Sequence, residues 1–199
     1  NYDDRYFAYG SIMRQGSSAF HPKHRWGTFW SASAGWMMSK ENWFKVKWID
    51  ELKIKASYGE NGNDQGMRYG YYYSDRFTIS NTNDNVALTP STTKGNEEIT
   101  GEKNSKFNVG VDFSMFKGRL SGTLEYYNNR TVDMLATIPY PPTLGYNAAL
   151  ANVGNMSNQG FEAELRGDVI RTRNFTWNLY ANISTNKNTI TKLAEKRKT

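Results

Sequence analysis

The chain has 199 residues, no cysteine, a formal net charge of +6 and a mean hydropathy of −0.75, although 15% of its residues are aromatic. The lack of cysteine excludes disulfides, thiolate metal sites and a cysteine nucleophile. A helical membrane protein is excluded because no run reaches the roughly 18 apolar residues that a membrane-spanning helix needs. Apart from a cluster at residues 192–198, Lys and Arg are spread along the chain, which argues against a nucleic-acid partner.

The first part of the chain predicts three strands, at residues 6–13, 28–39 and 52–58. The second of them alternates most clearly, and it carries a tryptophan near each end of its apolar stripe, as an aromatic girdle at two membrane interfaces would. Residues 41–50 lack alternation and predict a helical turn across the end of the sheet. In the third strand Lys53 and Lys55 lie opposite the apolar positions.

Residues 105–127 predict a β-hairpin, because apolar and polar side chains alternate on both sides of one short turn. In that turn Gly118 is free to adopt a positive φ. Two further strands are predicted at residues 161–169 and 175–185, joined by a short turn. Each of these strands has one apolar and one polar face, with a period of two.

Long polar segments separate several of the strands, and we predict loops at residues 14–27, 59–102 and 128–160. The last of these contains Pro139, Pro141 and Pro142, which cannot donate to a β-ladder, so residues 138–142 are predicted to be an extended loop and not a central strand. Short connections alternate with the long ones as the chain crosses back and forth. All the long loops are therefore expected at one end of the sheet.

This asymmetry decides between two fold classes that both use two-faced strands. A β-sandwich has no reason to collect every long loop at one end, whereas an outer-membrane barrel has short periplasmic turns and long extracellular loops. We therefore predict an all-β fold, an antiparallel transmembrane β-barrel fragment of about seven strands, with the rest of the barrel outside these residues. The alternative is a soluble β-sandwich that binds carbohydrate through its aromatic residues.

Several stretches resemble the SusC/RagA family of TonB-dependent outer-membrane transporters, in order and over nearly the whole chain. They are RQGSSAFHPKHRWGTFWSASAGWMMSKENWF, LKIKASYGENGN, KFNVGVDFSMFKGRLSGTLEYYNNRTVDML, IPYPPTLGYNAALANVGNMSNQGFEAEL and FTWNLYANISTNKNTITKL. The first departs from the family's RDGSSRFG pattern within a loop, where this chain reads RQGSSAFH.

The resemblance implies a 22-stranded barrel with an N-terminal plug in the cell outer membrane, in contact with lipid and lipopolysaccharide. It also implies energisation by TonB and a SusD-like lipoprotein that opens as a lid, and together these import glycans or peptides. The plug and the TonB box are absent from these residues, which are expected to form the barrel wall and extracellular loops.

The polar faces of the strands supply the candidate site residues. We predict that a group of charged side chains faces the lumen, where they hold water and polar substrate: Lys53, Lys55, Glu125, Glu162, Glu164 and Arg166. A carboxylate pair could indicate a glycosidase, but the charged strand that carries Glu162 and Glu164 favours a solvated wall.

A tyrosine cluster lies in the second long loop and is a candidate ligand or lid contact: Tyr69, Tyr71, Tyr72 and Tyr73. Packing of these rings within the loop, or on the partner lipoprotein, is the favoured alternative. His21 and His24 lack neighbouring ligands and are interpreted as surface residues. The sequence contains no nucleophile elbow or phosphate-binding glycine loop, so we predict no catalytic residue, no metal, no cofactor and no enzyme activity.

Overall fold

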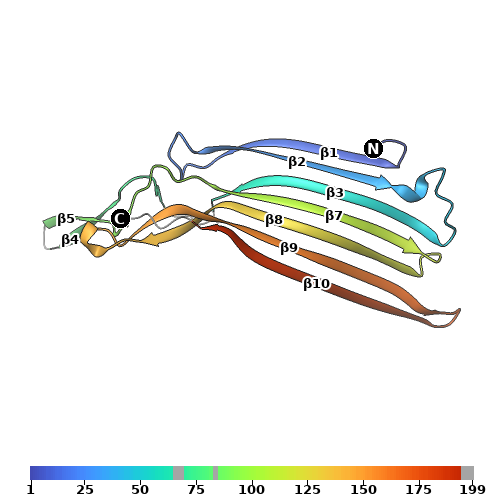
Figure 1. Cartoon of the computed structure of the whole chain (residues 1–199). Helices are drawn as coiled ribbons and strands as arrows, with labels where there is room; N and C mark the ends of the chain where they lie inside the picture. The colour runs from blue at the N-terminus through green and yellow to red at the C-terminus, as the bar shows by residue number, and fades with distance from the viewer. Residues whose placement is uncertain (65–69, 83–84, 194–199) are drawn as a thin grey trace.

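The chain forms one antiparallel layer of long strands in the computed structural model, which describes residues 1–64, 70–82 and 85–193 (Figure 1). The sheet has eight strands, of which the short β6 lies off the main path, so the prediction of about seven strands is confirmed. Along the main path each strand pairs with the one before it, in the order β1 (Tyr6–Gly16), β2 (Trp26–Met37), β3 (Ile49–Asn63), β7 (Glu102–Met115), β8 (Leu120–Pro139), β9 (Ala148–Arg171) and β10 (Thr176–Leu193).

The two ends of the sheet differ in their connections. At one end the strands are joined by residues 38–48, 116–119 and 172–175. At the other end the connections comprise residues 17–25, 64–101 and 140–147, and the small sheet of β4 (Phe77–Thr82) and β5 (Asn85–Pro90) projects from this end (Figure 1). We call these the short-turn end and the long-loop end. The expectation that all the long loops lie at one end is met only in part: residues 64–101 lie at the long-loop end, but the connection of residues 38–48 at the short-turn end is longer than residues 17–25 or 140–147.

At the short-turn end, neighbouring turns contact one another through backbone and side-chain groups. Gly118 has a φ of 74°, as predicted, and its N–H donates to Asp50 Oδ2 at 2.9 Å. The Phe116 N–H donates to the Trp48 carbonyl at 2.9 Å, and the two rings stack with centroids 5.8 Å apart. The helical turn expected at residues 41–50 is not found there: the short 3-10 helix η1 (Met38–Lys40) precedes these residues, and β3 begins at Ile49.

The prediction of a loop at residues 128–160 is wrong. β8 continues to Pro139 and β9 begins at Ala148, which leaves only residues 140–147 as the connection, with the 3-10 helix η3 (Pro142–Leu144) inside it. The pairing of β8 with β9 continues through two register shifts between Thr131 and Leu135. A backbone ladder does not require apolar alternation, so β8 and β9 stay paired although the alternating pattern disappears. Pro139 occupies the last position of β8, where a missing N–H is tolerated.

The other two predicted loops are shorter than expected, because β1 reaches Gly16, β2 begins at Trp26 and β3 reaches Asn63. Residues 64–101 contain three small strands that sequence reasoning missed, namely β4, β5 and β6 (Thr93–Lys94). Of these, β6 pairs in parallel with β9. A small core forms here around Phe20 and Ile99, which are 3% and 0% exposed. Partly buried residues pack against it: Ala19, Tyr72, Tyr73, Leu135 and Leu150.

The apolar face of the large sheet is not covered by a second layer. Side chains that a sandwich would bury between two sheets are well exposed, with Val109 and Leu124 at 37%, Leu165 at 41% and Leu179 at 54%. The soluble β-sandwich is therefore contradicted. Within the described residues, no helix has the length and apolar character needed to cross a membrane.

Candidate functional site: the polar face and the hydrophobic band

The register of the sheet places the predicted lumen-facing residues on one face. Lys55 is opposite Gly110, Gly110 is opposite Glu125, and Glu125 is opposite Glu162. The next row runs from Lys53 through Asp112 and Thr123 to Glu164, and Arg166 lies opposite Ser121. Directly opposite residues point to the same side of a sheet. All six predicted residues therefore share one face, which we call the polar face.

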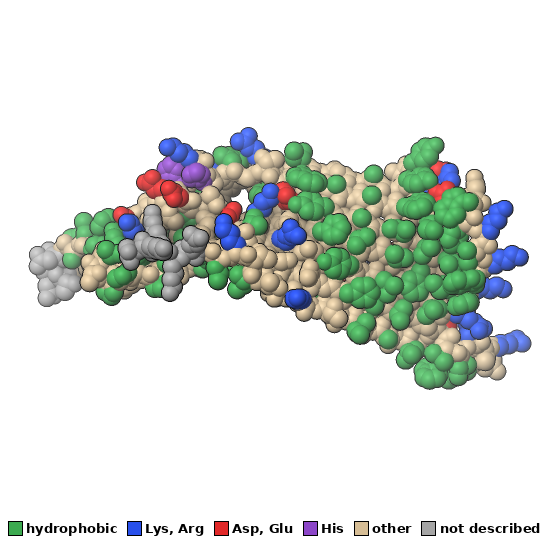
Figure 2. Space-filling view, viewed as in Figure 1, with side chains coloured by type: hydrophobic (Ala, Val, Ile, Leu, Met, Phe, Trp, Pro, Cys, Tyr) green, Lys and Arg blue, Asp and Glu red, His purple; other side chains and the backbone are tan. Residues whose placement is uncertain are grey.

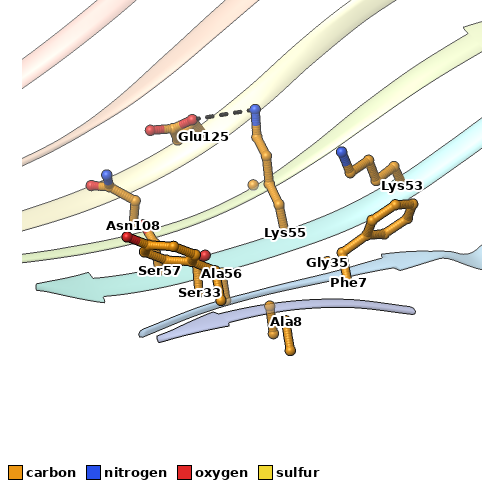
Figure 3. A pocket seen from close by; sticks show the side chains of 13 residues that line it. Phe7, Ala8, Ser33, Gly35, Lys53, Lys55, Ala56, Ser57, Asn108 and Glu125 are labelled. Carbon is orange, nitrogen blue, oxygen red and sulfur yellow. Dashed lines mark ion pairs between the residues drawn. The ribbon is translucent and has the colours of Figure 1, made fainter. Parts of the chain in front are cut away.

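An ion-pair network crosses three strands on the polar face. Lys55 Nζ lies 2.9 Å from Asp112 Oδ1. It also lies 3.6 Å from Glu125 Oε2, as the dashed line in Figure 3 marks. The Thr123 hydroxyl donates to the same Asp112 oxygen at 2.9 Å. Asp112 was not among the predicted site residues, although its polar position in the alternating hairpin is the signal that could have found it.

Gly110 makes room for this network. A Cβ at Gly110 would lie 2.9 Å from the Leu124 carbonyl oxygen and 3.0 Å from Lys55 Cε, so a side chain there would obstruct the path of Lys55 from β3 to β8. Lys53 extends toward the ring of Phe7, with Nζ 5.3 Å from the ring centroid (Figure 3). A hollow of about 350 Å³ lies on the polar face and is lined by residues of β1, β2, β3, β7 and β8.

The opposite face carries a continuous hydrophobic band (Figure 2). One of its rows runs from Ala56 through Val109 and Tyr126 to Phe161, and the next from Ile54 through Val111 and Leu124 to Ala163. Aromatic residues mark its limits, with the Trp30 and Tyr58 ring centroids 4.9 Å apart toward the long-loop end and the stacked Trp48 and Phe116 at the short-turn end. An apolar band between aromatic girdles is the lipid-facing pattern of membrane barrels.

Glu41 anchors the short-turn end to the rim of this band. Its Oε1 accepts hydrogen bonds from the Tyr6 hydroxyl and, at 3.0 Å, from Trp36 Nε1, while Arg5 Nη1 lies 3.2 Å from its Oε2. The hydrogen bond from Tyr6, followed by that from Trp36, lowers the pKa of Glu41. Sequence reasoning missed this residue because nothing in residues 41–50 indicated which strands the turn would contact.

The tyrosine cluster is divided between the loop core and the surface. Tyr72 and Tyr73 pack against the core of Phe20 and Ile99, and His21 contacts the Tyr73 ring edge to face at 5.6 Å. Tyr71 is 58% exposed, and Tyr69 lies outside the described residues. Contact of these rings with a ligand or lid stays a prediction. Among the residues that the structure describes, no group of three or more His, Cys, Asp or Glu side chains could hold a metal ion.

Comparison with known proteins extends these observations. Residues 1–197 match the family model described as TonB dependent receptor-like, beta-barrel. The chain is 33% identical to TonB-dependent receptor P39 of Formosa agariphila over 98% of its own length and 19% of that protein. It is 32% identical to TonB-dependent receptor SusC of Bacteroides thetaiotaomicron over 96% of its length and 20% of that protein.

Solved structures give the same result. The RagAB peptide transporter superposes with a TM-score of 0.87 at 30% identity, over 97% of this chain and 21% of that one. The siderophore receptor PirA of Pseudomonas aeruginosa shares the fold, with a TM-score of 0.59 at 13% identity over 95% of this chain and 33% of that one. The chain spans about a fifth of the curated relatives it matches.

Proposed function

Because this chain belongs to the TonB-dependent receptor β-barrel family, we propose that it forms part of the wall of an outer-membrane barrel that imports a nutrient. The observation that carries the proposal is the separation of the two faces of the sheet. One face is an exposed hydrophobic band, and the other holds charged groups that an apolar environment would not tolerate. Hydrocarbon on one side and a water-filled lumen on the other satisfy both faces at once.

The edges of the sheet support the proposal that the barrel closes with further strands. Within the described residues, β1 pairs only with β2 and β10 pairs only with β9, so each has one edge without a partner strand. An open edge in hydrocarbon is costly because each unpaired backbone group has no water to bond. We therefore propose that both edges pair with further strands of a longer barrel.

The long-loop end is proposed to face the cell exterior, where a SusD-like lipoprotein covers the barrel as a lid. An exposed apolar surface on the β4–β5 hairpin supports a protein partner at this end, since Ile79 is paired with Leu88 and these side chains are 69% and 66% exposed. Tyr71 offers a further exposed ring for the ligand or the lid. TonB would act through parts of the protein outside this chain.

The polar face is proposed to line the substrate path rather than to catalyse a reaction. Lys55 pairs with both Asp112 and Glu125. Other charged side chains of the polar face have no ion-pair partner among the described residues and are proposed to face water in the path: Lys53, Glu162, Glu164 and Arg166. The substrate is proposed to be a glycan or a peptide. The glycan class rests on the resemblance to the SusC/RagA family, and the similarity to the RagAB peptide transporter supports the peptide class.

Growth on defined nutrients tests this function. Cells that lack the gene for the full-length protein should fail to grow on one oligosaccharide or peptide mixture as the only source of carbon or nitrogen, and the restored gene should recover growth. A deletion of the neighbouring lipoprotein gene should give the same defect if the lid is required. Unchanged uptake of every labelled glycan and peptide pool by the deletion strain would contradict the proposal.

A further inference from the structure

The strands β2 and β3 separate before they reach the long-loop end (Figure 1). Their pairing ends with Ser31 opposite Gly59, so residues 26–30 of β2 and residues 60–62 of β3 have no partner strand on the sides that face each other, within the residues that the structure describes. We call the opening between these two segments the fork. Backbone groups along such strand edges are the ones that an extended peptide pairs with in β-augmentation.

A hollow of about 750 Å³ lies in the fork. The Phe29 ring reaches across the fork from β2 to β3: a Cβ at Gly27 or at Gly62 would lie 2.6 Å from Phe29 Cζ, so a side chain at either position would displace the ring. The volume is within the range of small-molecule binding sites, about 300–1,000 Å³. The hollow is therefore large enough for a short peptide or a small oligosaccharide.

The two sides of the fork carry opposite charges. On the side of β2 the lining of the hollow includes Lys23, His24 and Arg25, and on the side of β3, β7 and β8 it includes Asp64 and Asp133. Within the described residues no ion pair joins the two sides. In the same part of the chain the buried Arg25 Nε has no hydrogen-bond partner. A cationic side and an anionic side thus face the same hollow without neutralising each other.

Two further charged side chains of the lining are already engaged. The Glu102 carboxylate accepts hydrogen bonds from Asn63 Nδ2 and from the Leu135 N–H, both at 2.8 Å. Lys103 Nζ lies 2.8 Å from Glu60 Oε2. The groups that remain for a ligand are therefore basic on the side of β2 and acidic on the side of β3.

We propose that the fork binds the two ends of a short peptide, with the α-carboxylate toward Arg25 and the α-ammonium toward Asp64 and Asp133. A ligand that carries both charges satisfies both sides at once, whereas a neutral glycan satisfies neither. Arg25 can hold a carboxylate through two parallel N–H donors, and the strand edges of the fork offer partners for the peptide backbone. The inference rests on the import function proposed above and selects the peptide from its two substrate classes.

Binding of trialanine to the purified full-length protein, measured by isothermal titration calorimetry, tests this inference. The side chains of trialanine are neutral, so its two charges are those of its ends. Because a hydrogen-bonded charge is lost, the wild type should bind trialanine amide, and likewise N-acetyl-trialanine, about tenfold more weakly than trialanine. This comparison of ligands needs no variant and does not depend on whether a variant folds.

Variants then assign each end of the peptide to one side of the fork. Arg25→Gln should weaken trialanine binding about tenfold and leave the affinity for trialanine amide at the wild-type value. Asp64→Asn/Asp133→Asn should weaken trialanine binding by a similar factor and leave the affinity for N-acetyl-trialanine unchanged. Asparagine suits the φ of 55° at position 133, so this variant keeps the backbone of β8.

Matched controls remove single charges at the same end of the molecule but outside the hollow. Lys94→Gln and Glu97→Gln should bind all three peptides as the wild type does. Maltotriose, an uncharged ligand of similar size, should bind the wild type more weakly than trialanine. The proposal would be overturned by any of three results: no binding of trialanine, equal binding of the blocked peptides, or unchanged trialanine affinity in both fork variants.

Nutrient uptake by cells is measured in parallel, so that the two proposals can fail separately. Uptake of a glycan by cells whose purified protein does not bind trialanine would overturn the fork proposal and leave the import function intact. End-dependent binding of trialanine without uptake of any nutrient would support the fork and contradict the import function.

Discussion

The part of the molecule nearer the short-turn end, which we call the short-turn half, and the part nearer the long-loop end, the long-loop half, differ in how far the chain buries its apolar side chains. In the short-turn half, Leu124 and Leu165 remain 37% and 41% exposed, so the chain itself does not bury them. In the long-loop half, Phe20 and Ile99 are 3% and 0% exposed, and the chain itself buries them. The short-turn half therefore has the exposed apolar surface typical of a membrane barrel, whereas the long-loop half has a small buried core like that of a water-soluble protein.

A charge placed in the hydrophobic band should break the short-turn half. Leu124→Arg puts a guanidinium in the middle of the lipid-facing surface, at an expected cost of about 2–4 kcal/mol. Ile54→Arg, in the same row of side chains, should act alike. We expect little or no folded barrel in the outer-membrane fraction, measured by heat-modifiable mobility on gels.

The control is the neighbouring position on the other face. Glu125→Arg should insert normally, although it loses its contact with Lys55. Equal insertion of the Leu124 and Glu125 variants would contradict the assignment of the two faces.

A cavity in the loop core should affect only the long-loop half. Ile99→Ala removes a fully buried side chain, at an expected local cost of about 2–5 kcal/mol. Limited proteolysis should cut residues 64–101 faster, while the barrel keeps its thermal unfolding midpoint. Ile79→Ala, at a position 69% exposed, is the matched control and should change neither. A lowered barrel midpoint in Ile99→Ala would show that the two halves are coupled.

The Glu41 cluster should make the short-turn end sensitive to acid. The pKa of Glu41 is lowered by hydrogen bonds from Tyr6 and Trp36, so its stabilising contribution is present above the ordinary glutamate pKa of about 4.3. That contribution is lost as the pH falls through the lower pKa of the folded state. We expect unfolding midpoints from pH 7 to pH 3 to fall more for the wild type than for Glu41→Gln. Glu97→Gln should follow the wild type, and parallel curves for all three proteins would contradict the prediction.

The smallest effect is expected on the polar face. Lys55 and Asp112 are 37% and 34% exposed, and ion pairs open to water contribute about 0–1 kcal/mol. Lys55→Gln should therefore shift the denaturant midpoint only slightly, and Lys53→Gln should match it. A loss of several kcal/mol would mean that this face is dry, which contradicts a water-filled lumen.

The sequence predicted the short-turn half well because one physical constraint governs it. Where one side of a strand meets hydrocarbon and the other meets water, alternation is strict, and residues 105–127 and 161–169 show it. The six predicted residues of the polar face follow from the same parity. Asp112 was missed as their partner because a strand pattern fixes the face of a residue but not which side chain of the next strand it meets.

The long-loop half was predicted poorly because its strands lack strict alternation. β8 and β9 continue as a paired hairpin through residues that were predicted to be a loop, since backbone pairing does not depend on an alternating pattern. The core of Phe20 and Ile99 joins segments far apart in the sequence, and no local pattern indicates that they meet. The network at Glu41 likewise depends on Tyr6, which lies 35 positions away in the sequence.

Site-directed spin labelling tests the separation of the two faces most directly. This chain contains no cysteine, so single labels can be placed at residues 107–109 and 111–113 of the full-length protein once any cysteine elsewhere has been replaced. In lipid bilayers, labels at Val109 and Val111 should be accessible to oxygen and shielded from a water-soluble nickel complex, and labels at Asn108 and Asp112 should show the reverse. Equal access of the nickel complex to all positions, with no period of two, would contradict the account.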